Sequence, residues 1–256
     1  MATACESHSE TKSDVVINVS KQCSLTLKQY DEQKRCWPKI GRHILATFDE
    51  KTIIVYQAFK PAIAKYAVEN QRFGGPDFQL DRMSWIKTSF LWMMYRCGWA
   101  TKHNQERVLA VRITRDGFEE ILANAYTVEF QKARQIQTKD IRVRLQWDPD
   151  HGPSYSNQQR KAIQLGLKGE ILQKYSSDWI VNITDITDLV KSMKSDFDAG
   201  GAEKLWTPKE IIYNVSDNAI RERINLSSVS DCEEDQCSET QLPNASTSET
   251  KPESSS

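Results

Sequence analysis

Two positively charged side chains lie within an otherwise apolar and aromatic stretch of this sequence. Residues 83–102 read MSWIKTSFLWMMYRCGWATK, in which Lys87 and Arg96 stand among three tryptophans. A buried charge costs free energy unless another group pairs with it. One interpretation is the wall of a site for a flat anionic ligand, with Trp92 as an aromatic plane. The other is a core helix whose two cations reach solvent or pair with carboxylates.

The local structure of this stretch decides whether the two cations can act together. The sequence predicts a short, buried helix over residues 89–97, with Thr88 as its N-cap and Gly98 as its end. One face of this helix carries three side chains that could contact one ligand: Ser89, Trp92 and Arg96. Lys87 can join them only if it precedes the helix on an extended segment.

A second group of polar candidates lies where a strand is expected to lead into a helix. Residues 52–59, TIIVYQAF, are β-branched and aromatic and predict a buried strand that ends near Tyr56 and Gln57. Side chains at such an edge commonly face a cleft. Tyr56 fits either the core or the cleft, whereas the amide of Gln57 could hydrogen-bond another amide or a ribose.

Single carboxylates are the remaining candidates for catalysis. Glu170 follows two glycines and Asp148 precedes a proline, but a lone carboxylate is more often a helix cap or a solvated group. The sequence contains neither an HExxH motif nor a Ser/His/Asp arrangement, and it has no Gly-rich nucleotide motif. We therefore expect no metal site, no triad hydrolase and no Rossmann or phosphate-loop chemistry.

The elements that must position these residues alternate between strands and helices. Further strands are predicted over 107–113, 141–147 and 178–184, and further helices over 61–73, 116–126 and 185–197. In residues 141–147 apolar side chains alternate with Arg142, Arg144 and Gln146, which indicates one core face and one wet, cationic face. The pattern predicts a single α+β domain over residues 36–226, with a mixed, mostly antiparallel sheet and flanking helices.

Composition predicts less ordered ends and an intracellular protein. Residues 227–256 are rich in Ser, Thr and acidic side chains and are expected to be disordered, and residues 1–35 to be weakly ordered. The N-terminus lacks an apolar signal core, and no apolar run is long enough for a membrane span. We expect a cytoplasmic or nuclear location, no secretion and no membrane partner. With a net charge of −1, any anion site must be local.

Several motifs resemble one known family over about residues 36–200. They are GRHILATFDEKTIIVYQAFKPAIA, DRMSWIKTSFLWMMYRCGWATKHNQERVLAVRITRDGFE, VRLQWDPD, IQLGLKGE and WIVNITDIT. The chain is similar to the family called domain of unknown function 4291. This resemblance specifies a family and no activity.

A more distant similarity links the strand at residues 52–59 and the helix and glycine after it to ADP-ribosyltransferases. That resemblance implies a site for NAD in which Gln57 stands where a histidine is usual, Ser84 or Ser89 lines the nicotinamide, and Glu170 supports the transition state. It also implies aromatic and cationic groups around the planar rings and the pyrophosphate. The residues that could supply them are Arg42, Tyr56, Lys87, Trp92 and Arg96.

Three functions therefore remain open. The first is transfer of ADP-ribose from NAD to a protein or nucleic acid acceptor, with Gln57 and Glu170 as catalytic residues. The second is a nucleic-acid-binding or RNA-processing module without NAD chemistry, which would use Arg142 and Arg144. The third is an interaction domain without catalysis.

Overall fold

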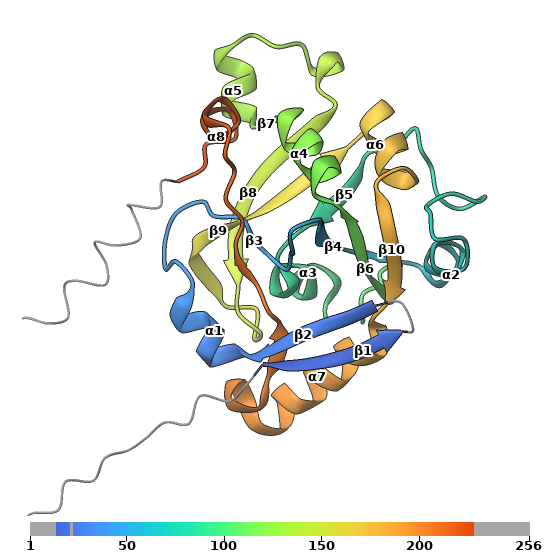
Figure 1. Ribbon diagram of the computed structural model, residues 1–256, viewed down its shortest axis with the longest axis vertical. Coiled ribbons are helices and arrows are strands. Elements are labelled where there is room, and N and C mark those ends of the chain that lie inside the picture. The colour runs from blue at the N-terminus through green and yellow to red at the C-terminus, as the bar shows by residue number, and fades with distance from the viewer. Residues whose placement is uncertain (1–13, 21–22, 228–256) are drawn as a thin grey trace, which may run out of the picture.

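The centre of the molecule is a seven-stranded, mostly antiparallel sheet (Figure 1). The computed structural model describes residues 14–20 and 23–227. Among the pairs of this sheet, only β7 and β8 are parallel. In spatial order the strands are β10 (Ile180–Asp185), β6 (Arg107–Thr114), β4 (Thr52–Phe59), β5 (Ser84–Lys87), β9 (Asn157–Leu167), β8 (Val143–His151) and β7 (Ala125–Tyr126).

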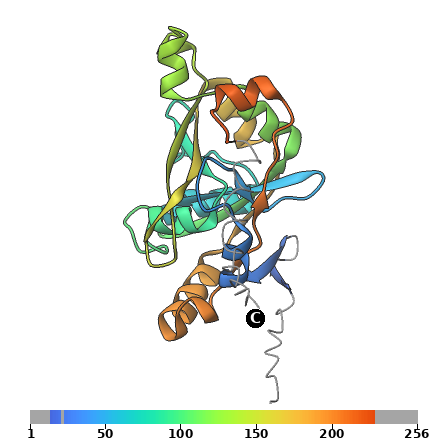
Figure 2. The ribbon, with the colours of Figure 1, turned by 90° about the vertical axis from the view of Figure 1, so that its left-hand side faces the viewer.

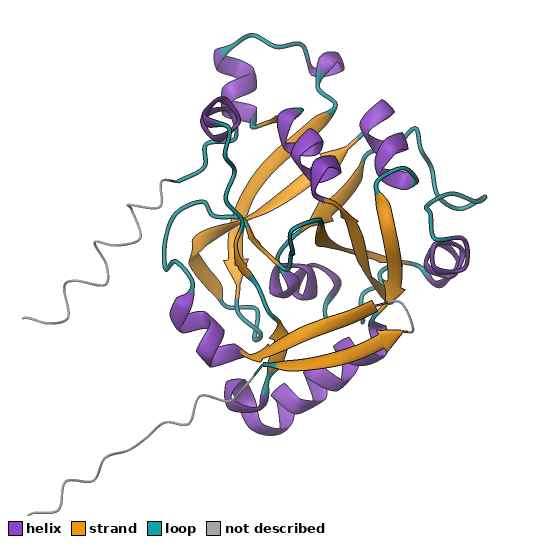
Figure 3. Ribbon diagram, viewed as in Figure 1, coloured by secondary structure: helices purple, strands orange, loops and turns teal. Residues whose placement is uncertain are grey.

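Helices surround this sheet (Figure 3). The α-helices are α1 (Tyr30–Cys36), α2 (Pro61–Asn70), α3 (Phe90–Cys97), α4 (Arg115–Ala123), α5 (Val128–Ala133), α6 (Gly169–Ser176), α7 (Thr187–Gly200) and α8 (Asn218–Arg223). Two 3₁₀ turns are η1 (Thr138–Asp140) and η2 (Gly201–Lys204). The structure thus confirms the predicted mixed α+β class with a mostly antiparallel sheet and flanking helices.

Each face of the sheet has its own core, because successive side chains of a strand point to opposite faces. Ile53 and Val55 of β4 pack into one core together with side chains of α2, α4 and α6. Ile54 and Tyr56 of the same strand pack into the other core, with α3 and α7. The predicted strand over 52–59 is β4, and its continuous apolar run reflects burial on both faces.

Two smaller sheets join segments that are far apart in the sequence. One has the order β1 (Val15–Ser20), β2 (Cys23–Gln29) and β11 (Trp206–Pro208), and the other pairs β3 (Leu45–Ala46) with β12 (Ile211–Ile212). Figure 2 shows the three-stranded sheet beside α7 at one end of the molecule, with α5 at the opposite end.

The N-terminal segment corrects one prediction. Residues 1–35 were expected to be weakly ordered, but their described part forms β1, β2 and most of α1. Leu25 and Leu27 of β2 are buried in the core that also contains α3, so this segment belongs to the fold. The short alternation of β2, with Thr26 between the leucines and Lys28 after them, carries the signal that the composition of the segment obscured.

The predicted tail, residues 227–256, lies outside the described residues except for Ser227. The backbone N–H of Ser227 donates to the carbonyl of Arg42 at 3.1 Å. Among the described residues, no helix is long and apolar enough to cross a membrane.

Candidate functional site

The apolar stretch with two cations folds as a short strand followed by a short helix. β5 ends at Lys87, and α3 begins at Phe90 after Ser89, whose hydroxyl accepts a hydrogen bond from the backbone N–H of Trp92. Ser89, rather than the predicted Thr88, is therefore the N-cap. Gly98 ends the helix in the left-handed conformation with φ of 61°, as predicted. Lys87 thus lies on the extended segment that a shared role with α3 requires.

Strand register places a row of polar side chains on one face of the sheet. Lys87 pairs with Gln164 of β9, and Gln164 pairs with Gln146 of β8. Directly paired residues share a face, and residues two apart on a strand do as well. Arg144 and Asp148 therefore lie on the same face as Lys87. We call this side of β5, β9 and β8, which α3 adjoins, the Lys87 face.

Lys87 is the most perturbed cation of this face. It is only 6% exposed, its Nζ lies 5.4 Å from the centre of the Trp92 ring, and it donates to the Trp85 carbonyl at 3.4 Å. Burial lowers the pKa of the Lys87 ammonium to about 7, with a smaller contribution from the positive charge of Arg96. Near neutral pH a large share of Lys87 is therefore an uncharged amine, which can accept a proton.

Asp148 supplies a carboxylate next to this lysine. Burial raises the pKa of Asp148, while a hydrogen bond from Gln164 at 2.6 Å and the charge of Lys87 oppose that shift. The same Gln164 amide donates to the side-chain oxygen of Gln146 at 2.9 Å. Asp148 and Gln146 also line a cavity of about 230 Å³ that Arg42 borders. Of the predicted cations, Arg42 and Lys87 thus both lie near Asp148.

Three buried nitrogen atoms around this face lack a hydrogen-bond partner within the described residues. They are Trp92 Nε1, Arg144 Nε and His151 Nδ1. Tyr95 connects two of these residues, because its ring stacks on His151 at 3.5 Å and meets the Trp92 ring edge-to-face at 6.4 Å. Buried polar atoms are normally paired. Unpaired nitrogens beside a lysine are what a site for an acceptor-rich ligand provides.

Trp85 adds an aromatic surface to the Lys87 face. It pairs with Gly166 of β9 and is two residues from Lys87, so it lies on the same face. A Cβ atom at Gly166 would come within 3.0 Å of the Trp85 ring, so the ring lies directly over this glycine. Trp85 is half-buried, unlike Trp92, which is only 4% exposed. Trp85 is therefore the tryptophan whose ring can take a stacked ligand.

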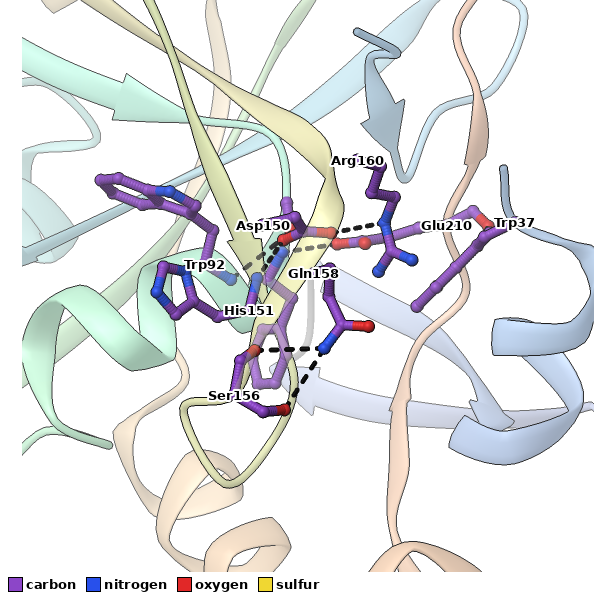
Figure 4. Close-up of polar contacts among 10 residues, drawn as sticks. Trp37, Trp92, Asp150, His151, Ser156, Gln158, Arg160 and Glu210 are labelled. Carbon is purple, nitrogen blue, oxygen red and sulfur yellow. Dashed lines mark hydrogen bonds and ion pairs between the residues drawn. The ribbon is translucent and has the colours of Figure 1, made fainter. Parts of the chain in front are cut away.

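A buried polar network supports the start of α3 (Figure 4). Asp150 accepts a hydrogen bond from Arg160 Nε at 2.7 Å through one oxygen, and from the Ser89 hydroxyl at 3.4 Å through the other. Glu210 accepts from the backbone N–H of Phe90 at 2.6 Å. Burial raises the pKa of Glu210 to about 8. Figure 4 shows Trp92 and His151 on one side of Asp150, and Arg160 and Trp37 on the other.

Gln57 lies on the opposite face of the sheet from Lys87. Its neighbour Tyr56 pairs with Lys87, so the Gln57 side chain points the other way. Its amide donates to Ser84 Oγ at 2.9 Å and to the Trp85 carbonyl at 3.0 Å, and its oxygen accepts from the Tyr175 hydroxyl at 2.7 Å. Gln57 is 2% exposed. Gln57 and Ser84 thus form a satisfied buried network, and the structure does not bring them to the Lys87 face.

The other predicted residues divide between core, surface and site. Tyr56 is fully buried and packs edge-to-face against Phe90 at 5.5 Å, so it is a core residue. Glu170 is exposed on the first turn of α6, a helix that packs into the core on the Gln57 side. Arg96 is exposed and donates to Gln105 at 3.3 Å. Its charge still acts on Lys87.

Sequence reasoning did not commit to several residues that complete the Lys87 face. These are Trp85, Arg144, Asp148, His151 and Gln164. Alternation in residues 141–147 correctly placed Val143 and Leu145 in the core and Arg144 outside it. Nothing in the sequence showed that β9 lies between β5 and β8, and this order is what brings the four residues of β8 and β9 next to Lys87.

The fold and this face define a mixed α+β protein whose sheet carries a buried lysine, a carboxylate and unpaired nitrogen donors. The model of a protein family described as a domain of unknown function, DUF4291, matches residues 43–213. The chain belongs to the DUF4291 family, as its motifs predicted. No curated protein matches the chain.

Proposed function

We propose that the chain binds NAD on the Lys87 face and transfers ADP-ribose to a protein or nucleic acid acceptor. The observation that carries the proposal is the buried Lys87 close to the half-buried carboxylate of Asp148, with nitrogen atoms without partners nearby. The proposal keeps the predicted activity and keeps Lys87 and Arg42 among the residues of the site. It replaces Glu170 with Asp148 and removes Gln57 from the site.

The chemical groups on this face match the parts of NAD. Arg42 and the unpaired Nε of Arg144 can neutralise and hydrogen-bond the pyrophosphate. The half-buried ring of Trp85 offers a plane for nicotinamide or adenine. Trp92 Nε1 and His151 Nδ1 are placed to hydrogen-bond polar atoms of the ligand.

The proposed reaction replaces one bond to the ribose C1′ with another. The glycosidic bond breaks, and its electron pair leaves with neutral nicotinamide. Positive charge then develops on the ribose, where the Asp148 carboxylate stabilises it. The acceptor forms the new bond to C1′ and loses its proton to the uncharged amine of Lys87, whose pKa of about 7 suits a general base.

A direct test measures nicotinamide release and label transfer from NAD labelled in its ADP-ribose part. We expect Lys87→Met and Asp148→Asn each to slow release by about 100-fold or more, the usual scale for losing an acid–base or charge-stabilising group. Glu170→Gln is the matched carboxylate control and should stay within about twofold of wild type.

The outcomes separate the proposal from its rivals. Wild-type protein that neither binds NAD nor releases nicotinamide would overturn the proposal. Loss of activity in Glu170→Gln with Asp148→Asn intact would move the site to the side predicted from sequence. Salt-dependent binding of single-stranded RNA without any NAD breakdown would favour the nucleic-acid-binding alternative, in which Arg144 contacts phosphate. If the chain is an interaction domain without catalysis, we expect neither NAD breakdown nor RNA binding.

A further inference from the structure

A second cavity lies beside α1, on the other side of Asp150 from Trp92 and His151 (Figure 4). Its volume is about 540 Å³, and its walls come from α1, the loop after it and the start of β9. None of the residues that line it is among those proposed above to bind NAD or to act in its breakdown. Typical small-molecule sites have volumes of about 300–1,000 Å³. The cavity is therefore large enough for a ligand of its own.

Arg160 is the buried cation in the wall of this cavity. It is 4% exposed, and its guanidinium carbon lies 5.0 Å from the centre of the Trp37 ring, which fixes the plane of the group. Its Nε donates to Asp150 at 2.7 Å. Within residues 14–20 and 23–227, the two terminal nitrogens of Arg160 have no hydrogen-bond partner, and Figure 4 shows them directed away from Asp150.

This arrangement leaves the two terminal nitrogens of the Arg160 guanidinium free to donate hydrogen bonds to a ligand. Arginine carries five N–H donors in one plane, and Asp150 occupies only the Nε side. The two terminal nitrogens open to the cavity, where a ligand can bind them. A tetrahedral or planar oxyanion can take both terminal nitrogens at once.

The rest of the cavity wall adds positive charge at the surface. Lys34 and Arg35 are exposed in the last turn of α1, and Lys39 is exposed in the following loop. Asp31 is the one acidic side chain among the residues that line the cavity. Asp150 already neutralises Arg160. Three surface cations against one carboxylate leave an excess of two, which suits a dianionic phosphate better than a single carboxylate.

We propose that this cavity binds the phosphate of a nucleotide-sized phosphorylated ligand, with Arg160 as the fork that holds the phosphate. Arg35 and Lys39 attract and contact the phosphate, and the side chains of Gln158 and its neighbours face the remainder of the ligand. The site is independent of the function proposed for the Lys87 face, because it shares no residue with the proposed NAD site.

Calorimetric titration with adenosine 5′-monophosphate tests this site in the full-length chain. The titrations use the Lys87→Met background, so that binding on the Lys87 face cannot account for the signal. We expect saturable binding of the nucleotide, and at least tenfold weaker binding after Arg35→Glu/Lys39→Glu. The matched control, Lys51→Glu/Lys132→Glu, changes the net charge equally at exposed positions and should stay within about twofold.

Two further ligands and one further variant test whether the phosphate is recognised and whether Arg160 holds it. Adenosine without phosphate should not bind, and inorganic phosphate should bind more weakly than the nucleotide. Arg160→Lys keeps a positive charge beside Asp150 but removes the fork, and should weaken binding at least tenfold. If Arg160→Lys fails to fold, the affinity of Arg35→Glu/Lys39→Glu for the nucleotide decides whether the cavity is the binding site.

The proposal has clear contrary outcomes. It is wrong if the nucleotide does not bind at low salt, or if Arg35→Glu/Lys39→Glu binds it as tightly as the Lys51→Glu/Lys132→Glu control. Equal affinity for adenosine would exclude recognition of phosphate. Equal affinity for inorganic phosphate would exclude a nucleotide-sized ligand. Each of these results leaves the test of NAD breakdown unaffected.

Discussion

The two faces of the central sheet bury polar groups in different ways. On one face, the Gln57 amide bonds to Ser84, the Trp85 carbonyl and the Tyr175 hydroxyl. On the other, Lys87 lies against Trp92 with its ammonium destabilised by burial, and nearby nitrogen atoms have no partner within the described chain. The comparison teaches that burial of a polar side chain marks a ligand site only where its hydrogen bonds remain unmade.

The largest expected effect comes from the pH dependence of Lys87. In the unfolded chain this lysine keeps its proton up to about pH 10.5, whereas in the folded chain it loses it near pH 7. The unfolded state therefore binds more protons between these values, so the contribution of Lys87 to stability rises with pH in this window. Relative to Lys87→Met, wild type should gain on the order of 4 kcal/mol in the free energy of unfolding between about pH 7 and pH 10.

Urea denaturation at several pH values measures this difference. Lys65→Met, at an exposed lysine, is the control and should run parallel to wild type. If Lys87→Met also runs parallel to wild type, Lys87 is not destabilised by burial and the contrast between the two faces disappears.

Gln57→Leu should have the next largest effect, on stability alone. The leucine removes the partner of the Tyr175 hydroxyl and the amide that donates to Ser84 Oγ and to the Trp85 carbonyl. Unsatisfied buried groups of this kind cost about 2–3 kcal/mol in the free energy of unfolding. The urea midpoint should fall, and Tyr175→Phe in the same background should cost little more. A variant of normal stability that had lost NAD binding would instead place Gln57 in the site.

The smallest of these three effects is the change in the pKa of Lys87 that Asp148→Asn should cause. The negative charge of Asp148 raises the pKa of Lys87, so its removal should lower that pKa further, by less than about one unit. Titration of the lysine Cε chemical shift by NMR, with Lys87→Met to assign the resonance, measures the change. Asp140→Asn, at an exposed carboxylate, should leave the titration unchanged. An unchanged titration in Asp148→Asn would show that the charge of Asp148 does not act on Lys87.

Local patterns in the sequence predicted the elements better than their arrangement. The β-branched run of β4 and the stop at Gly98 both depend on side chains within a few residues, and the structure confirms them. The N-cap was misplaced by one residue, because Thr88 and Ser89 are both suitable caps.

The candidate site required information that no short pattern contains. Alternation shows that Tyr56 and Gln57 point to opposite faces, but only the pairing of Tyr56 with Lys87 shows which of them faces the lysine. Asp148 reaches the site because β9 lies between β5 and β8. Lys87 was recognisable in advance, because an isolated charge in an apolar run signals an unusual environment wherever the strand is placed.

The pairing of β2 with β11 links the order of synthesis to the order of folding. Gln29 pairs with Trp206, so β2 contacts a strand that is made far later in translation. Until β11 has left the ribosome, one edge of β2 has unpaired backbone groups that can bind another extended chain. The three-stranded sheet is therefore completed only late in synthesis, and a nascent chain stalled before β11 should be prone to aggregation through the exposed edge of β2.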